Sequence, residues 1–220
     1  MTEEGSATDP LLGDPRVAEY LGPAWTAVSG FDALLRREGV IRGLVGPREL
    51  QRLWERHLLN SAAAARFLPT AGTVIDLGSG AGLPGVVLAG MRPDLQFVLL
   101  EPMLRRTKWL EEAIADLRLA NTRVLRARAE DVAGSVTGDA VTSRAVASLD
   151  KLYGWTAPLL RPGGELIALK GARAAEEIRE GAAVGERLGF APARVDDAFT
   201  IDGVEPTRVV RARWKGRRVR

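Results

Sequence analysis

The stretch VIDLGSGAGLPG, residues 74–85, ends an apolar run with an acidic residue and then places four glycines in one turn. Glycines let the chain turn sharply after a strand, and they let a ligand lie against bare backbone at the start of the next helix. A second acid, Glu101, ends the apolar run FVLLE about 25 residues after Asp76. An acid at the carboxyl end of a neighbouring strand accepts hydrogen bonds from both hydroxyls of a ribose. The pattern therefore predicts a site for a ligand that contains a nucleoside.

The sequence GAGLPG, residues 80–85, also matches the Gly-x-Gly-x-x-Gly pattern of dinucleotide sites, which makes an NAD-dependent oxidoreductase a second candidate. In such a site the helix terminus faces a pyrophosphate, and Asp76 would bring negative charge close to it. S-adenosylmethionine has no phosphate and carries a sulfonium and an ammonium, so a nearby acid favours it. We therefore predict S-adenosylmethionine as the cofactor; the alternative for Asp76 is a local role in which its carboxylate caps nearby amides. The contacts predicted from these residues are Asp76, Gly80, Gly82 and Glu101.

These residues would be positioned by βαβ units, because from Thr73 onward short β-rich runs alternate with helical stretches. The runs expected as strands are residues 73–78, 96–101, 122–128, 140–146, 163–171, 193–201 and 207–214, and the helices expected between them are residues 83–90, 104–119, 149–160 and 172–188. No helix separates the last two runs, so they are predicted to pair antiparallel at the sheet edge. The predicted fold class is α/β, a Rossmann-like class I methyltransferase fold with a mostly parallel seven-stranded sheet and an antiparallel edge hairpin.

The region before Thr73 is predicted to be a helical extension packed on this core. Its clearest segment, residues 47–68, begins with Pro47 in the first turn and repeats apolar residues at helical spacing. Those apolar residues are Leu50, Leu53, Trp54, Leu58 and Ala62. The expected division of the chain is a disordered tail over residues 1–12, the helical extension over residues 13–70 and the cofactor-binding domain, with a basic C-terminal tail, over residues 71–220.

The amino-acid composition excludes several kinds of site and of catalysis. The chain has no cysteine, which excludes disulfides, thiolate metal sites and covalent catalysis through sulfur, and no metal site is predicted. Acids and turn formers stand where a signal peptide would begin, and no apolar run approaches the roughly 20 residues that a bilayer requires, so we expect a cytoplasmic protein.

The C-terminal segment of the chain contains a cluster of basic residues without an acidic residue among them. Contacts with RNA phosphates are predicted at Arg208, Arg211, Lys215, Arg217 and Arg218, with a solvated tail as the alternative.

Six motifs together resemble one family. WERHLLNS, IDLGSGAGLPGVVLA, LLEPMLRRTKWL, ARAED, TSRAVASL and ALKG are similar to segments of RsmG (GidB), the bacterial 16S ribosomal RNA guanine-N7 methyltransferases, from about Trp54 to Lys170. The resemblance implies S-adenosylmethionine as methyl donor, and as partner the 16S rRNA of the small ribosomal subunit or of an assembly precursor. No membrane and no obligate protein partner are expected, and the chain is expected to be a monomer.

The resemblance also implies roles for single residues. The positions that would border the cofactor are Gly78 and Leu83 in the glycine loop, Glu101 at the ribose, and Ala129 with Glu130 at the adenine. Arg144 would lie at both the cofactor and the target guanine. The chain departs from the family pattern over residues 39–50, which lack the family's Asn-Leu-Thr, and at Asn60, where an acid is common.

Three residues are predicted to act in catalysis, namely Arg144, Lys170 and His57. Arg144 and Lys170 each end a predicted strand on the ligand side, where a cation can meet an RNA phosphate or O6 of guanine; ion pairing with neighbouring acids is the alternative. His57 lies in a family motif, although a lone histidine on a helix is more often a packing or surface residue.

The predicted reaction is direct in-line attack by guanine N7, without a covalent enzyme intermediate. Guanine N7 has an in-plane lone pair and no proton, so proximity and orientation take the place of a general base. Two other interpretations stay open at this point: an NAD-dependent oxidoreductase, and an RNA-binding protein on the same fold without catalytic activity.

Overall fold

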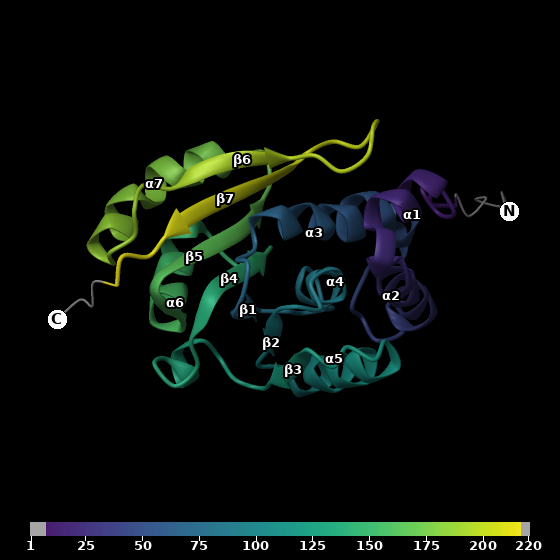
Figure 1. Cartoon of the computed structure of the whole chain (residues 1–220), viewed down its shortest axis with the longest axis horizontal. Coiled ribbons are helices and arrows are strands. Elements are labelled where there is room, and N and C mark those ends of the chain that lie inside the picture. The colour runs from purple at the N-terminus through teal and green to yellow at the C-terminus, as the bar shows by residue number, and fades with distance from the viewer. Residues whose placement is uncertain (1–7, 217–220) are drawn as a thin grey trace, which may run out of the picture.

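A seven-stranded sheet forms the centre of the computed structural model, which describes residues 8–216 (Figure 1). Its strands are β1 (Thr73–Leu77), β2 (Gln96–Leu100), β3 (Thr122–Leu125), β4 (Gly138–Arg144), β5 (Leu160–Lys170), β6 (Arg194–Ala198) and β7 (Thr207–Arg213). Their order in this part of the chain is β3-β2-β1-β4-β5-β7-β6. Neighbouring strands from β3 to β5 are parallel, whereas β7 runs antiparallel to both β5 and β6. The predicted α/β fold class with an antiparallel edge hairpin is confirmed.

Helices cover both faces of the sheet. On one face lie α4 (Gly85–Met91), α5 (Leu104–Asp116) and the N-terminal helices, and on the other lie α6 (Leu149–Thr156) and α7 (Ala174–Arg187). Successive residues of a strand point to opposite faces, and the strands supply apolar side chains to both layers. The parallel strands all end at one edge, so the turns that follow β1, β2 and β4 meet there. No helix among the described residues is long and apolar enough to cross a membrane.

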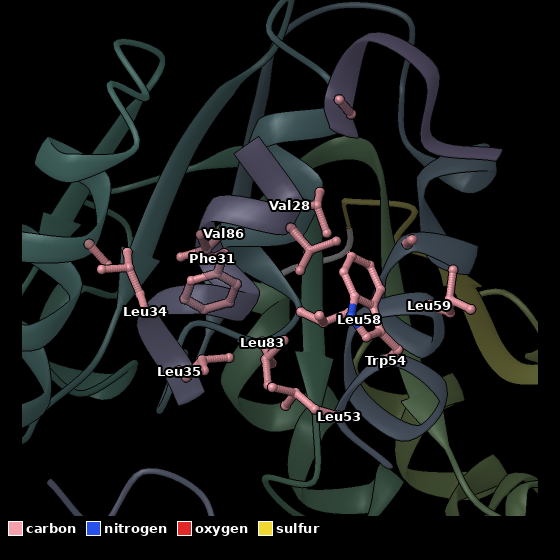
Figure 2. Packing of buried hydrophobic residues seen from close by; sticks show 14 of the residues in the cluster. Val28, Phe31, Leu34, Leu35, Leu53, Trp54, Leu58, Leu59, Leu83 and Val86 are labelled. Atoms are coloured by element: carbon pink, nitrogen blue, oxygen red, sulfur yellow. The ribbon is translucent and has the colours of Figure 1, made fainter. Parts of the chain in front are cut away.

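The N-terminal helices share one hydrophobic core with the glycine loop. Phe31 of α2 (Trp25–Glu38) packs in the same cluster as Trp54 and Leu83, the last of which belongs to the loop itself (Figure 2). Phe31 and Trp54 are at most 1% exposed. Burial of a large apolar side chain contributes on the order of 2–3 kcal/mol, so these helices support the loop and do not form a separate unit.

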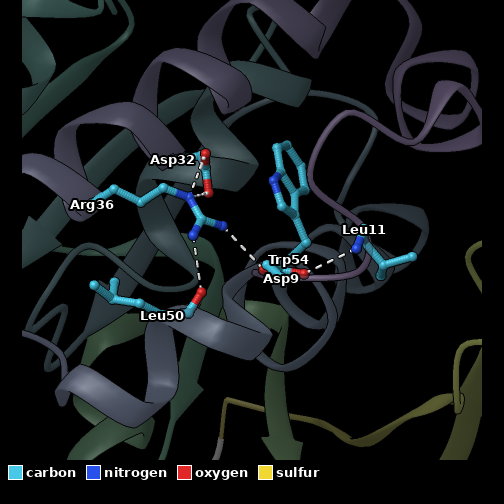
Figure 3. A network of polar contacts seen from close by, with 6 residues as sticks. All are labelled: Asp9, Leu11, Asp32, Arg36, Leu50 and Trp54. Atoms are coloured by element: carbon cyan, nitrogen blue, oxygen red, sulfur yellow. Dashed lines mark hydrogen bonds and ion pairs between the residues drawn. The ribbon is translucent and has the colours of Figure 1, made fainter. Parts of the chain in front are cut away.

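Residues 47–67 are helical, but they do not form the single helix that their periodicity predicts. The segment consists of the 3₁₀-helix η2 (Pro47–Arg52), the π-helix η3 (Trp54–Leu59), α3 (Asn60–Ala62) and the 3₁₀-helix η4 (Ala63–Phe67). An α-helix would join the N–H of Trp54 to the carbonyl of Leu50. Here the Leu50 carbonyl accepts from Arg36 Nη1 at 3.0 Å, and the Trp54 N–H donates to Asp9 Oδ2 at 2.9 Å. The side chains of Arg36 and Asp9 thus bind the acceptor and the donor of that α-helical hydrogen bond, and the bond does not form (Figure 3).

Asp9 lies in the tail that was expected to be disordered, and the structure contradicts that expectation over residues 9–12. The Asp9 side chain is fully buried, and its carboxylate pairs with Arg36 Nη2 at 3.1 Å (Figure 3). Asp32, one turn earlier in α2, also binds Arg36, with 2.9 Å between Oδ1 and Nε. The composition of the tail could not show this, because the partners of Asp9 lie 27 and 45 residues away. Residues 1–7 lie outside the part of the chain that the structure describes.

The edge hairpin returns to the N-terminal helices. In α1 (Pro15–Leu21), Arg16 Nη1 donates to the carbonyl of Asp202, in the β6–β7 connection, at 3.0 Å. Asn60 Nδ2 donates to Thr207 Oγ1, at the start of β7, at 2.9 Å. These contacts join segments that are 186 and 147 residues apart in the sequence.

Candidate cofactor and substrate site

Asp76, at the end of β1, lies beneath the glycine loop. Its buried carboxylate accepts hydrogen bonds from Gly85 N and from Thr142 Oγ1, each at 3.1 Å. Burial raises the pKa of this carboxyl to about 6, although its hydrogen bonds act in the opposite direction. The side chain does not line the neighbouring cavity. The Asp76 carboxylate thus accepts from the amide of Gly85 at the start of α4, which is the alternative stated for it, and its predicted contact with the cofactor stays a prediction.

Two glycines of the loop face a cavity, and one faces the core. Gly78 and Gly80 have φ values of +70° and +57°, a region that glycine occupies without a side-chain penalty. A Cβ on Gly78 would lie 2.8 Å from Val146 Cγ2, so the bare backbone keeps this space open. A Cβ on Gly82 would instead lie 2.9 Å from the Phe31 ring. The missing side chain of Gly82 therefore serves packing against Phe31, and its predicted contact with the cofactor stays a prediction.

Glu101 follows β2 and ties the glycine loop to that strand. Its carboxylate accepts from Gly80 N at 3.0 Å and from Met103 N at 2.9 Å, and its side chain is 3% exposed. Arg106 Nη1 lies 3.9 Å from the same carboxylate. A carboxylate offers about four acceptor positions, so acceptor capacity remains for hydroxyl donors of a ligand. Position and free capacity both fit a ribose-binding acid.

A cavity of about 560 Å³, here called the cofactor cavity, opens beside the glycine loop. The predicted cofactor residues that line it are Gly78, Gly80, Leu83, Glu101, Ala129, Glu130 and Arg144. Its walls also include residues to which sequence analysis gave no role there, among them Leu44, Met103, Arg106, Ala127 and Trp155. Arg106 stands in the first turn of the helix after Glu101, and that position is the signal that could have indicated it.

Arg144, at the end of β4, is held by two uncharged acceptors. Its Nη1 donates to the carbonyl of Arg56 at 3.0 Å, and its Nη2 lies 2.9 Å from His57 Nδ1. A guanidinium only donates, so Nδ1 accepts and the ring proton lies on Nε2, which is 2.6 Å from Glu49 Oε2. Burial lowers the pKa of Arg144 to about 10, which leaves it cationic at neutral pH. The structure thus brings Arg144 and His57 together and adds Glu49, which no sequence pattern had singled out.

A second cavity, of about 790 Å³, shares residues 144–146 with the cofactor cavity. Lys170, at the end of β5, lines only the second cavity, and its Nζ donates to Ala147 O and to Glu177 Oε2, each at 2.6 Å. This is the alternative stated for a strand-end cation, an ion pair with a neighbouring acid. Among the described basic residues that line the second cavity, Arg144 forms no ion pair with a carboxylate. Acidic partners are present for Arg52, Arg56, Lys170 and Arg173.

The basic residues near the C-terminus do not form one surface. Arg208 is exposed and pairs across the sheet with Lys170, close to the second cavity. Arg211 turns away from solvent, and its Nη2 binds Glu165 Oε2 at 2.8 Å. Lys215 follows the far end of β7, so the structure does not bring Arg211 or Lys215 together with Arg144. Outside the described residues lie Arg217 and Arg218.

The sheet order, the glycine loop and the acid after β2 define a class I methyltransferase. The lining of the cofactor cavity fits an adenosyl cofactor without phosphate: the Glu101 carboxylate can accept from the ribose hydroxyls, the bare loop backbone admits close approach, and Leu83 offers apolar contact. M. jannaschii TYW2 in complex with AdoMet shares the fold, with a TM-score of 0.56, 18% identity, and coverage of 72% of this chain and 75% of that chain. A SAM-dependent O-methyltransferase from Thermotoga maritima has a TM-score of 0.56 at 16% identity, covering 74% of this chain and 67% of that chain.

Sequence comparison identifies the family. The family described as "GidB: rRNA small subunit methyltransferase G" matches residues 26–199. A "Ribosomal RNA small subunit methyltransferase G" from a Nocardioides species is 48% identical, covering 97% of this chain and 86% of that relative. A protein of the same name from Salinispora arenicola is 53% identical, covering 83% of this chain and 78% of the relative. The chain belongs to this family, as its motifs indicated, and S-adenosylmethionine is its cofactor.

Proposed function

We propose that this methyltransferase modifies N7 of a guanosine in the decoding-region loop of 16S rRNA, by direct in-line attack and without a covalent enzyme intermediate. The family description and the names of the relatives support RNA of the small ribosomal subunit as the substrate. The observation that carries the proposal is the place of Arg144. It is a cation without a carboxylate partner, in the wall that the cofactor cavity shares with the second cavity.

The chemistry of this target agrees with the residues present. S-adenosylmethionine supplies a methyl group bound to a sulfonium, and guanine N7 offers a lone pair with no proton to remove. No residue of the chain therefore has to act as a general base, and the chain has no cysteine for a covalent adduct with the base. Arg144 can donate to O6 of guanine, the acceptor beside N7, and so orient the base. Orientation is then the main catalytic contribution of the protein.

The second cavity is the proposed place of the target nucleotide. Its walls are polar, and exposed Arg208 lies next to Lys170 at its edge. An enzyme that acts on a base takes it out of the stack into such a pocket. Basic residues around the entrance then hold the phosphates of the flanking strand.

The proposal includes the setting in which the enzyme acts. The substrate is rRNA within the small subunit or an assembly precursor, which places the protein in the cytoplasm. We expect the chain to act as a monomer without an obligate protein partner.

The test is transfer of labelled methyl from S-adenosylmethionine to small-subunit particles from cells that lack this gene, followed by nuclease digestion. We expect the label as 7-methylguanosine from 16S rRNA, and we expect Arg144→Ala to reduce transfer about 100-fold or more. Arg194→Ala is the matched control, because Arg194 lies on β6 and lines neither cavity. Label in another nucleoside would contradict the assigned atom. Binding of RNA and cofactor without any transfer would favour the RNA-binding alternative.

A further inference from the structure

Glu49, His57 and Arg144 meet in one line of contacts, although they belong to η2, η3 and β4. Glu49 Oε2 lies 2.6 Å from His57 Nε2, and His57 Nδ1 lies 2.9 Å from Arg144 Nη2. The His57 side chain is 16% exposed, whereas that of Glu49 is 36% exposed. Both ring nitrogens of a largely buried imidazole are therefore occupied, one by an anion near the surface and one by the cation of the site.

One protonation state of His57 satisfies both contacts. A neutral ring with its proton on Nε2 donates to Glu49 and accepts at Nδ1 from Arg144. The other neutral tautomer would place two N–H groups against each other at Nδ1, and an imidazolium would also oppose the charge of Arg144. The charged groups that face the ring are Glu49 from η2, Arg144 from β4 and Arg56 from η3. Burial, followed by the charge of Arg144, lowers the pKa of His57, so the ring is neutral at pH 7.

We propose that Glu49 is a positioning residue: it selects the Nε2–H tautomer of His57, and this leaves Nδ1 free to hold the Arg144 guanidinium between the two cavities. The inference rests on the proposed function in one respect, that Arg144 meets the target base. Without the carboxylate, Arg144 keeps its bond to the Arg56 carbonyl and loses its fixed partner at Nη2. Cofactor contacts at Glu101 and the glycine loop do not involve Glu49, so the loss should appear in turnover rather than in cofactor affinity.

His57 is the only histidine of the chain, so ¹⁵N-histidine labelling of the tag-free protein reports on a single ring. Two-bond ¹⁵N–¹H correlation spectra near neutral pH should show the Nε2–H tautomer in the parent. Glu49→Ala removes the acceptor beside Nε2 and should give a mixture of the two tautomers. Glu38→Ala is the matched control, because Glu38 pairs with Arg37 and Arg42 and lines neither cavity. A parent ring protonated on Nδ1, or a Glu49→Ala ring that keeps the parental tautomer alone, would overturn the proposal.

Turnover supplies the second measurement. Glu49→Ala should lower kcat for methyl transfer to small-subunit particles about tenfold or more, while the Kd for S-adenosylmethionine changes less than about threefold. An unchanged kcat would overturn the proposal, and so would an equal loss of cofactor affinity, which indicates general damage. The spectra require no RNA. If neither protein methylates the particles, the proposed function fails, and the tautomer of His57 still decides whether Glu49 positions Arg144.

Discussion

Arg144 keeps its positive charge available because a backbone carbonyl and a neutral imidazole hold it. A carboxylate would hold the guanidinium as firmly, but it would offset the charge that a substrate is to meet. Lys170 shows that second situation, since its Nζ lies 2.6 Å from a Glu177 oxygen. Both cations end parallel strands of the same sheet. Their hydrogen-bond partners, and not their positions at strand ends, therefore determine whether each positive charge is available to a substrate.

Asp76→Asn should alter how stability depends on pH. The pKa of buried Asp76 is raised from 3.8 to about 6, so its contribution to stability is complete below the lower value and is lost as pH rises through the higher one. The Asn variant has no such loss. Its unfolding free energy relative to the parent should therefore rise between about pH 4 and about pH 7, by on the order of 3 kcal/mol. Urea unfolding of both proteins across this range measures the difference, and a constant difference would contradict the expectation.

Gly78→Ala should weaken cofactor binding. At a φ of +70° an alanine costs about 1–2 kcal/mol. Its Cβ would also lie 2.8 Å from Val146 in the wall of the cofactor cavity. We expect calorimetry to show roughly tenfold weaker binding of S-adenosylmethionine. Gly154→Ala in α6 is the control, because its Cβ would meet no atom within 4 Å and alanine suits a helix. Parental affinity in Gly78→Ala would remove this loop from the cofactor site.

Sequence motifs predicted the site residues that follow parallel strands, because those strand ends must converge at one edge of the sheet. Gly78, Glu101 and Arg144 were found in this way. The direction of a single side chain is not encoded in such a pattern, which therefore could not show that the Asp76 carboxylate points beneath the loop. Glu49 was missed for another reason: eight residues of continuous α-helix span about 12 Å, so the spacing to His57 gives no sign of contact.

Contacts with residues outside the segment determine the conformation of the helical segment that carries His57. Asp9 and Arg36 take the Trp54 N–H and the Leu50 carbonyl, and the π-helix η3 begins at that point. Periodicity predicted a helix here because it records which face is apolar. It contains nothing about a hydrogen-bond partner that lies 45 residues away.

Strands were easier to predict than this segment, since an apolar run between turn formers is a local signal. Even there, β5 begins at Leu160 and not at the predicted Gly163, and the register of its pairing with β4 shifts between Gly138 and Ala140. The early start takes the strand through Pro162, a residue that argues against a strand in sequence analysis. An irregularity that depends on the neighbouring strand has no signature in the run itself.

Asp9→Ala should destabilise the protein by about 2–4 kcal/mol, because it leaves the buried Trp54 N–H without an acceptor and removes one of the two carboxylates around Arg36. Asp14→Ala is the matched control. That residue caps α1 through the N–H of Arg16 at an exposed position, and its loss should destabilise the protein less than the loss of Asp9 does. Urea denaturation compares the two. An equally small effect for Asp9→Ala would mean that the buried network does not hold the opened helix.

Two basic residues of β7, Arg208 and Arg211, have different surroundings and should have different roles. Arg208 lies at the edge of the second cavity, whereas Arg211 is bound to Glu165 and Asp196. Arg208→Ala should weaken binding of small-subunit rRNA and reduce the slope of log affinity against log salt by about one. Arg211→Ala should leave that slope unchanged and lower the unfolding free energy by about 1–3 kcal/mol. Filter binding at several salt concentrations measures the two slopes. Equal slopes for the two variants would contradict the separate roles of Arg208 and Arg211.

The position of β7 also bears on how the chain is made. Among the described strands β7 comes latest in the sequence, yet it lies between β5 and β6. During synthesis, the 11-residue strand β5 therefore presents an unpaired edge until residues 207–213 have left the ribosome. Such an edge pairs readily with other chains, so the nascent protein is exposed to aggregation between the synthesis of β5 and that of β7. Truncation before β7 would remove an interior strand, and with it the Thr207 contact that joins the hairpin to Asn60.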